Sequence, residues 1–312
     1  MMTGRSDNPF LAIGLKLCAV VMFVVMGAFV KAASVEVPPG EAVFFRSFCA
    51  LPVIVLWLAS RGELSTGLRT RSPKGHLLRG MIGSTAMGLS FAGLAILPLS
   101  EVKAIQYAVP IFVVILAALI LGETIRKVRI AAVAMGLIGV LIILWPRLSI
   151  ISDGASTVET IGALLVLGGS FCAALAQVLV RRMVATEHPA AIVFWFSIIA
   201  SGLALLSAPF GWVVPGWETL GFLIGAGIVG GLGQIFGTNA YRFGDAGIVA
   251  PFDYASILFA LAIGFVFFGE VPTVPMIAGS AVVIAAGVLI IVREQQLRLK
   301  RGQARQHVSK YG

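Results

Sequence analysis

The sequence predicts an all-α integral membrane protein with ten transmembrane helices, arranged as two inverted repeats of five helices. Three observations lead to this expectation: the composition, ten apolar runs and an internal repeat. The chain is 59% hydrophobic and 12% charged, with a mean hydropathy of +1.01. Soluble domains average about 45–50% apolar and about 25% charged residues, so the composition excludes an ordinary soluble fold.

Ten apolar runs have about the length that crosses a bilayer as a helix, roughly 20 residues. They cover residues 9–33, 41–60, 76–97, 101–121, 128–146, 159–182, 190–210, 218–241, 246–268 and 272–292. The first run exceeds the roughly 7–15 residues of a signal-peptide core, so we interpret it as a span. The expected segments are a cytoplasmic N-terminus (1–8), a first repeat (9–146), an external linker (147–158), a second repeat (159–292) and a basic cytoplasmic tail (293–312).

The distribution of basic residues predicts the orientation. If the N-terminus is cytoplasmic, 18 of the 23 Lys and Arg residues lie in internal segments. Lys31, Lys103 and Arg147 lie outside or at the outer boundary, and Lys16 and Arg46 lie within spans. Because cytoplasmic loops of membrane proteins are enriched in Lys and Arg, we expect both termini on the cytoplasmic side.

The two halves of the chain repeat one another. An offset of 150 aligns Pro39, Val43, Phe44 and Ser47 with Pro189, Val193, Phe194 and Ser197. An offset of 147 aligns Tyr107, Ala108, Phe112, Gly122 and Glu123 with Tyr254, Ala255, Phe259, Gly269 and Glu270. Because five is an odd number of spans, the second copy starts on the opposite side of the membrane. Such inverted repeats are typical of transporters that alternate access around a midplane site.

These features resemble the drug/metabolite transporter superfamily, in its ten-helix EamA-type branch, over about residues 10–292. The pieces that carry the resemblance are Leu97-Pro98-Leu99-Ser100, Pro110, Leu121-Gly122-Glu123, Gly136 and Gly139, Ala250-Pro251-Phe252, Tyr254, Phe268-Gly269-Glu270, and Gly279 with Gly287. The resemblance implies a secondary carrier with a cavity between its halves, which moves amino acids, vitamin-like metabolites, nucleosides or amphiphilic drugs. Riboflavin is one candidate solute, because riboflavin importers belong to this branch.

Two charged residues at matched cytoplasmic depth are the main candidates for transport chemistry. Asp253 lies about seven residues into the ninth span, or about 10 Å deep, and must be paired, protonated or in a water-filled cavity. Lys16 lies about as deep in the first span, so the two could meet. Asp253 is either a proton-coupling or substrate-amine site or half of a structural ion pair. Lys16 could also snorkel to the headgroups.

Other polar or helix-breaking residues in the spans are weaker candidates. Arg46 would snorkel or contact phosphate. Alternatively it would act as a gate or, if it faces the cavity, bind a carboxylate or phosphate of the substrate. The uncharged candidates for the cavity lining are Gln106, Tyr107, Gln177, Gln234, Asn239 and Tyr254. Pro110 and Pro251 interrupt the fourth and ninth spans, as hinges, as part of a polar lining made by freed backbone carbonyls, or simply as tolerated kinks.

Further motifs have a structural interpretation. Glu123 and Glu270 end the fourth and ninth spans, where each carboxylate could satisfy backbone donors of the next helix. Gly225, Gly227 and Gly230 formally spell GxGxxG, but no strand precedes them. The spacings in this span instead predict faces of small residues for close helix packing.

The alternatives to a transporter are a lipid flippase and a membrane-embedded enzyme that acts on a lipid-linked substrate. No HExxH motif, P-loop or basic face interleaved with aromatics occurs in the sequence. We therefore expect no catalytic residues, no metal, no cofactor and no nucleic-acid partner. The expected partners are a small-molecule substrate and the lipid of a bacterial-type inner membrane, with the protein monomeric or homodimeric.

Overall fold

The computed structural model describes residues 9–121, 127–149, 157–183, 186–243, 252–253, 255–286, 288–289 and 292, and within these ranges it is helical without strands. The first half contains α1 (Pro9–Ala33), α2 (Pro39–Phe48), α3 (Ala50–Ser60), α4 (Leu64–Gly67), α5 (Pro73–Ile96), α6 (Leu99–Gln106), α7 (Ala108–Leu121) and α8 (Lys127–Ser149). The second half contains α9 (Thr157–Met183), α10 (Pro189–Leu205), α11 (Trp217–Phe243), α13 (Ala255–Phe268) and a helix at Val274–Ala286. These helices coincide with the apolar runs to within a few residues at most boundaries.

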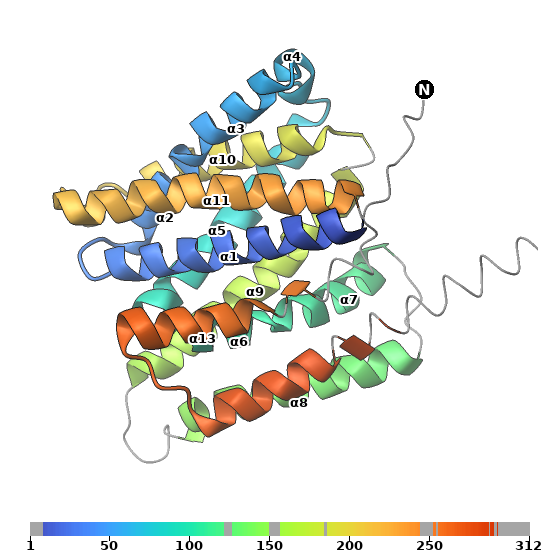
Figure 1. Ribbon diagram of the computed structural model, residues 1–312, viewed down its shortest axis with the longest axis vertical. Coiled ribbons are helices and arrows are strands. Elements are labelled where there is room, and N and C mark those ends of the chain that lie inside the picture. The colour runs from blue at the N-terminus through green and yellow to red at the C-terminus, as the bar shows by residue number, and fades with distance from the viewer. Residues whose placement is uncertain are drawn as a thin grey trace, which may run out of the picture.

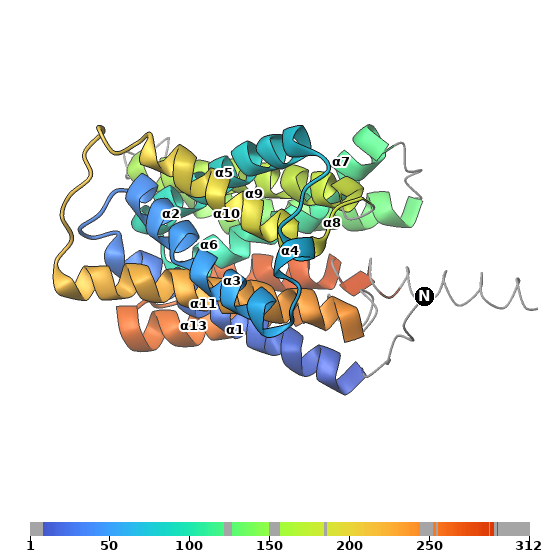
Figure 2. The same ribbon diagram turned by 90° about the horizontal axis from the view of Figure 1, so that it is seen from above.

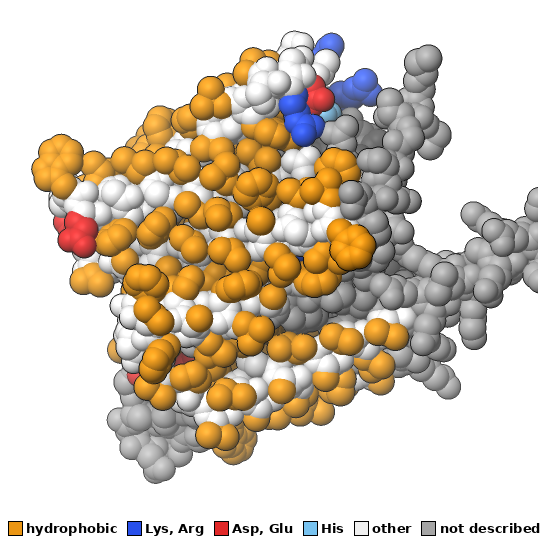
Figure 3. All heavy atoms as spheres, in the orientation of Figure 1, with side chains coloured by type: hydrophobic (Ala, Val, Ile, Leu, Met, Phe, Trp, Pro, Cys, Tyr) orange, Lys and Arg blue, Asp and Glu red, His pale blue; other side chains and the backbone are white. Residues whose placement is uncertain are grey.

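Five of the described helical stretches are long and apolar enough to cross a membrane: Phe10–Ala33, Pro39–Ser60, Leu99–Ile120, Thr157–Val180 and Trp217–Gly237. Four shorter apolar helices accompany them, at Ala134–Ile143, Ala190–Leu205, Ala255–Phe268 and Val274–Ala286. Large apolar side chains are exposed along these helices, among them Leu119, Trp145 and Phe267 at 77%, 69% and 76%. Figure 3 shows hydrophobic side chains spread across the face in view, with charged side chains near its edges. The chain is a multi-pass membrane protein, because only lipid makes such a surface favourable.

Two of the long helical stretches are broken, and in both cases a proline explains the position. α2 ends at Phe48 and α6 ends at Gln106, each four residues before a proline, Pro52 or Pro110. Proline has no N–H to donate to the carbonyl four residues earlier, and its ring clashes there. The break near Pro110 was expected from the sequence and the break near Pro52 was not. Pro251 lies outside the described residues.

The helices form two layers, which Figure 2 shows from above. α1, α11 and α13 lie in one layer, and α5, α9 and α10 lie in the other. The most extensive helix contacts are those of α1 with α11, side by side in Figure 1, and of α5 with α9. α2 joins the layers, because it packs against α5, α10 and α11.

Glycines permit the closest approaches, as the small-residue spacing predicted. A Cβ on Gly227 of α11 would lie 2.4 Å from the Cβ of Cys49, and one on Gly225 would lie 3.0 Å from the ring of Phe29. Gly139 of α8 and Gly279 face each other, and a Cβ on either would come within 2.8 Å of the other's carbonyl oxygen. These separations leave no room for a side chain without movement of the neighbouring helix.

Candidate functional site

Lys16 and Asp253 form an ion pair, with 2.7 Å between Lys16 Nζ and Asp253 Oδ1. Lys16 projects from α1 and its side chain is only 9% exposed, whereas the Asp253 side chain is 53% exposed. Lys16 therefore points inward and does not snorkel to the headgroups. Asp253 lies with Phe252 in a short turn ahead of α13. The pairing that matched depth suggested is present, and the exposed carboxylate leaves one side of the pair accessible.

Tyr107 lies at the break between α6 and α7 and connects this break to the start of α13. Its hydroxyl is 2.9 Å from Ser256 Oγ and accepts a hydrogen bond of 3.0 Å from the Ile257 N–H. Ser256 is three residues beyond Asp253, so the tyrosine hydroxyl and the Lys16–Asp253 pair belong to one polar region at the start of α13. Beside it on α6, Gln106 accepts a hydrogen bond of 3.3 Å from Lys103 Nζ. Lys103 is thus part-buried on α6 rather than fully exposed.

The other uncharged candidates are more dispersed. Gln177 of α9 is exposed. Asn239 of α11 donates to the Ile235 carbonyl at 2.9 Å and lines an apolar groove of about 650 Å³ between α1, α3 and α11. Gln234 is part-buried on α11, and Tyr254 lies outside the described residues.

Arg46 of α2 does not snorkel, contrary to the first expectation. It is 3% exposed, and its guanidinium carbon lies 5.8 Å from the centre of the Phe196 ring on α10. Arg79 of α5 reaches the same ring from 3.8 Å. Arg79 was counted from the sequence among the cytoplasmic charges, because it follows a run of basic residues. Its position six residues into α5, about 9 Å along the axis, was the signal for an inward location.

Glu270 caps a helix, but not the one that follows it. Its carboxylate accepts the Leu99 N–H at the start of α6, at 2.9 Å for Oε2, and pairs with Lys31 Nζ at 3.1 Å. The next helix is capped by Thr273, whose Oγ1 accepts the Met276 N–H. The expected role at a helix start is right, whereas the expected partner is wrong, because packing brings the start of α6 closer. Glu123 lies outside the described residues.

Replacing Glu270 by Gln is expected to lower the free energy of unfolding by about 1–3 kcal/mol, because the part-buried Lys31 ammonium and the Leu99 N–H lose a charged acceptor. Thermal unfolding of the purified protein in detergent measures this. The matched control is Glu218→Gln, a substitution at an exposed carboxylate in the first turn of α11. Equal melting temperatures for both variants and the parent protein would contradict the capping role.

Two further carboxylates hold loops of one half against helix starts of the other, and sequence reasoning missed both. Glu36, in the loop before α2, accepts the Gly216 N–H at 2.7 Å and the Thr219 hydroxyl at the start of α11. Glu187, in the loop before α10, accepts the Arg71 N–H at 2.8 Å and the Thr70 hydroxyl at 3.4 Å, just ahead of α5. We name these contacts the Glu36 tether and the Glu187 tether.

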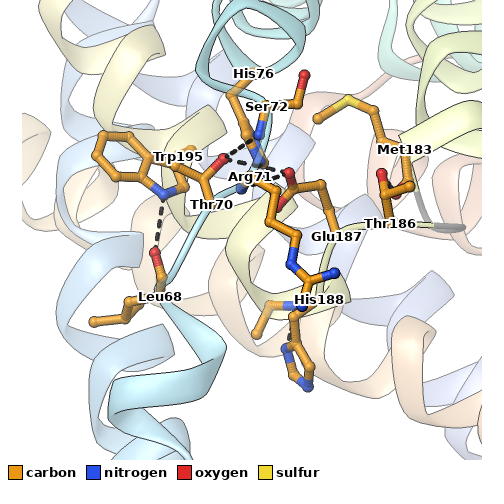
Figure 4. A network of polar contacts seen from close by, with 11 residues as sticks. Leu68, Thr70, Arg71, Ser72, His76, Met183, Thr186, Glu187, His188 and Trp195 are labelled. Carbon is orange, nitrogen blue, oxygen red and sulfur yellow. Dashed lines mark hydrogen bonds and ion pairs between the residues drawn. The ribbon is translucent and has the colours of Figure 1, made fainter.

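The Glu187 tether is the centre of a polar network, shown in Figure 4. The Oε2 atom of Glu187 lies 3.4 Å from Nε2 of His76, and both side chains are almost fully buried. Burial by itself would raise the pKa of the Glu187 carboxyl, but the hydrogen bond from the Arg71 N–H and the nearby His76 side chain outweigh it and lower the pKa. The pKa of Glu36 is also lowered, by its hydrogen bonds from Thr219 and Gly216.

The lowered pKa of Glu187 predicts a pH dependence of stability. The stabilising contribution is complete above the pKa of an unperturbed glutamate, about 4.5, and is lost as the pH falls through the lower folded value. We expect the melting temperature to fall below that pH, and Glu187→Gln to melt lower at neutral pH with a weaker acid dependence. Melting curves from neutral to acidic pH test this. Parallel curves for the variant and the parent would refute it.

Known proteins resemble the chain over most of its length. The pseudopaline exporter CntI of Pseudomonas aeruginosa is 34% identical over 274 residues, 86% of this chain and 89% of that protein. The riboflavin transporter of Rhizobium johnstonii is 31% identical over 240 residues, 75% of each chain. The S-adenosylmethionine uptake transporter of Rickettsia prowazekii is 27% identical over 256 residues, 82% of this chain and 84% of that protein.

A solved crystal structure shares the fold, with a TM-score of 0.65 at 20% identity over 92% of this chain and 98% of that one. The model of the EamA-like transporter family matches the sequence twice, over residues 10–145 and again over 160–293. Each match covers one of the two halves that the internal repeat had delimited. With the apolar surface and the helical fold, these matches place the chain in the EamA-like transporter family, a family of small-molecule transporters of the drug/metabolite type.

Proposed function

We propose that the protein is a secondary transporter that moves a small organic metabolite across the cytoplasmic membrane by alternating access. In this proposal ten helices form two inverted halves, both termini are cytoplasmic, and the solute binds between the halves. The observation that carries the proposal is the pairwise correspondence of the contacts that join the halves.

The correspondence is visible in the helix pairs. Under the sequence repeat, α1 corresponds to α9 and α11 corresponds to α5. The contact of α1 with α11 is then the counterpart of the contact of α5 with α9, and these are the two most extensive. Such symmetry supports an inverted repeat, in which one arrangement of the halves opens to one side and its mirror arrangement opens to the other.

The two tethers correspond in the same way. The Glu36 tether joins the loop before α2 to the start of α11, and the Glu187 tether joins the loop before α10 to the start of α5. Each consists of a carboxylate that accepts one backbone N–H and one threonine hydroxyl. The starts of α11 and α5 lie at opposite ends of the helix layers in Figure 2. In this proposal the tethers lie at opposite membrane faces, as a transporter with two gates requires.

The relatives indicate the kind of solute. Their names refer to riboflavin, S-adenosylmethionine and pseudopaline, with transport in both directions. For this chain we propose a polar metabolite of similar size, a vitamin such as riboflavin or an amino-acid derivative. The Lys16–Asp253 pair, with its carboxylate 53% exposed, is the proposed site for a coupling proton or a substrate amine.

Counterflow in proteoliposomes tests the proposal. Vesicles are preloaded with one solute from a panel of amino acids, nucleosides and flavins, and uptake of the labelled solute is followed. Solute-specific counterflow that is absent from protein-free vesicles is expected. Absence of counterflow for every solute, together with scrambling of labelled lipid, would favour the flippase; modification of a lipid-linked substrate in detergent would favour the enzyme.

A further inference from the structure

We propose that Arg46 and Arg79 form a binding site for the anionic group of the solute, a carboxylate or a phosphate. This inference rests on the proposed transport function and deepens it, because it assigns a chemical class to the substrate. Three helices build the site: α2 contributes Arg46, α5 contributes Arg79, and α10 contributes the Phe196 ring on which both guanidinium groups lie.

Among the residues that the structure describes, neither arginine has an anionic partner. Nε and Nη1 of each guanidinium group are buried and have no hydrogen-bond partner, and no ion pair in the described part of the chain includes either residue. Lys16 and Lys31, by contrast, are each paired with a carboxylate, at 2.7 and 3.1 Å. An arginine cannot discharge by losing its proton. The ring recovers only part of the cost of removing two charges from water, so an anion is the missing component.

Two further buried hydroxyls lie next to members of this site in the sequence. Ser47 and Ser197 follow Arg46 and Phe196 in sequence, are fully buried and have no partner for Oγ. Buried serines elsewhere, such as Ser84 and Ser170, donate to the carbonyl four residues earlier. Guanidinium forks and hydroxyls bind carboxylate and phosphate oxygens directly. Two guanidinium groups, which only donate hydrogen bonds, do not suit a cation or an apolar ligand.

The arginines also lie where the two halves meet. Arg46 and Phe196 are separated by 150 residues, the offset that aligns α2 with α10, so equivalent positions of the two repeats contact each other. Gly83 of α5 and Gly230 of α11 are separated by 147 residues. A Cβ on Gly83 would lie 2.9 Å from the Phe196 ring, and one on Gly230 would lie 3.4 Å from Arg46 Nε. Two equivalent glycines therefore leave room for the two arginines and the Phe196 ring. These residues lie at the interface between the repeats, which is where such transporters bind their substrates.

Thermal stabilisation by anions tests the site without knowledge of the solute. The probes are inorganic phosphate and succinate, with succinamide as the neutral counterpart, added to the purified protein in detergent at constant ionic strength. We expect the anions, and not succinamide, to raise the melting temperature of the parent protein. Arg46→Gln and Arg79→Gln should abolish the shift. Arg61→Gln, which removes an exposed arginine stacked on Trp57 at 4.9 Å, should retain it.

Melting temperatures measured without added anion distinguish a loss of anion binding from a folding defect. Because each substitution removes an uncompensated buried charge, Arg46→Gln and Arg79→Gln should melt at or above the parent temperature. A structural role for the arginines predicts lower melting instead. Arg46→Lys keeps the positive charge but loses the planar guanidinium group. It should fold normally and show a smaller rise in melting temperature with anions. No anion shift in the parent, or an equal shift in the glutamine variants, would overturn the inference.

Transport measurements distinguish failure of the site from failure of the function. Counterflow is compared for two pairs of solutes: riboflavin 5′-phosphate with riboflavin, and histidine with histidinamide. If the parent protein transports one of these pairs, the counterflow rate of its carboxylate- or phosphate-bearing member should fall at least about tenfold in the arginine variants. If the variants show counterflow without this selective loss, the anion site is refuted but the proposed transport function still stands. If anions raise the melting temperature only when both arginines are present, but no solute shows counterflow, the anion site stands and the proposed transport function is refuted.

Discussion

Replacing Asp253 by Asn is expected to abolish uptake that is driven by a pH gradient, while counterflow at equal pH continues. An amide has nearly the shape of a carboxyl group but cannot load and release a proton. It also removes the charge that faces Lys16 Nζ at 2.7 Å. We expect gradient-driven uptake to fall by at least about tenfold and counterflow to change far less. Proteoliposomes with an imposed pH difference provide both measurements from one preparation.

The control for this experiment must separate coupling from the loss of an ion pair inside the protein. The double variant Lys16→Met with Asp253→Asn removes both charges and should fold at least as well as Asp253→Asn alone, because no lysine charge remains beside an amide. Glu218→Gln, at an exposed carboxylate, controls for net charge. Uptake by Asp253→Asn that still responds to the pH gradient would exclude Asp253 as the proton-coupling group.

Cross-linking either tether is expected to stop transport altogether. In a background without Cys18, Cys49 and Cys172, which are free thiols, paired cysteines replace Glu36 and Thr219 on one face, or Thr70 and Glu187 on the other. The wild-type side chains of each pair are in contact. A short bifunctional thiol reagent then holds a loop of one half against a helix start of the other. If each face must open once in every cycle, either cross-link should lower counterflow at least about tenfold.

Two controls complete this experiment: cleavage of the cross-link and variants with a single cysteine. A reductant that cleaves the cross-link should restore the rate, and each single cysteine treated with the same reagent should remain active. Full activity with either pair completely cross-linked would contradict a cycle in which that face opens. Inhibition by one pair only would identify the other tether as a permanent structural contact.

The helices and several contacts followed from the sequence because they depend on local chemistry or simple geometry. Apolar runs of bilayer length gave the helix positions, and Pro110 gave the break near Tyr107. Lys16 and Asp253 could be paired in advance, because the predicted topology puts each at a similar distance from the same membrane face. Such depth arguments use only the rise per residue and the topology.

Other contacts depend on helix rotation and on packing between distant segments, which a single sequence does not specify. Depth alone left open whether Arg46 faces lipid or the interior. Glu270 caps a helix that begins 171 residues away, and no local pattern indicates that partner. Glu36 and Glu187 did carry a signal: each lies two or three residues before a repeat-related proline, Pro39 or Pro189, that begins a helix.

The broken helices have a mechanical consequence. Within α2–α3 and α6–α7, proline has already removed a backbone hydrogen bond at the break, so the angle between the two segments can change without rupturing that bond. In hydrocarbon, where a lost backbone hydrogen bond finds no water in exchange, an unbroken helix would resist such bending strongly. We therefore propose that each proline makes its helix a flexible hinge. The free-energy cost of the missing hydrogen bond would then be met once, during folding, and not in every transport cycle.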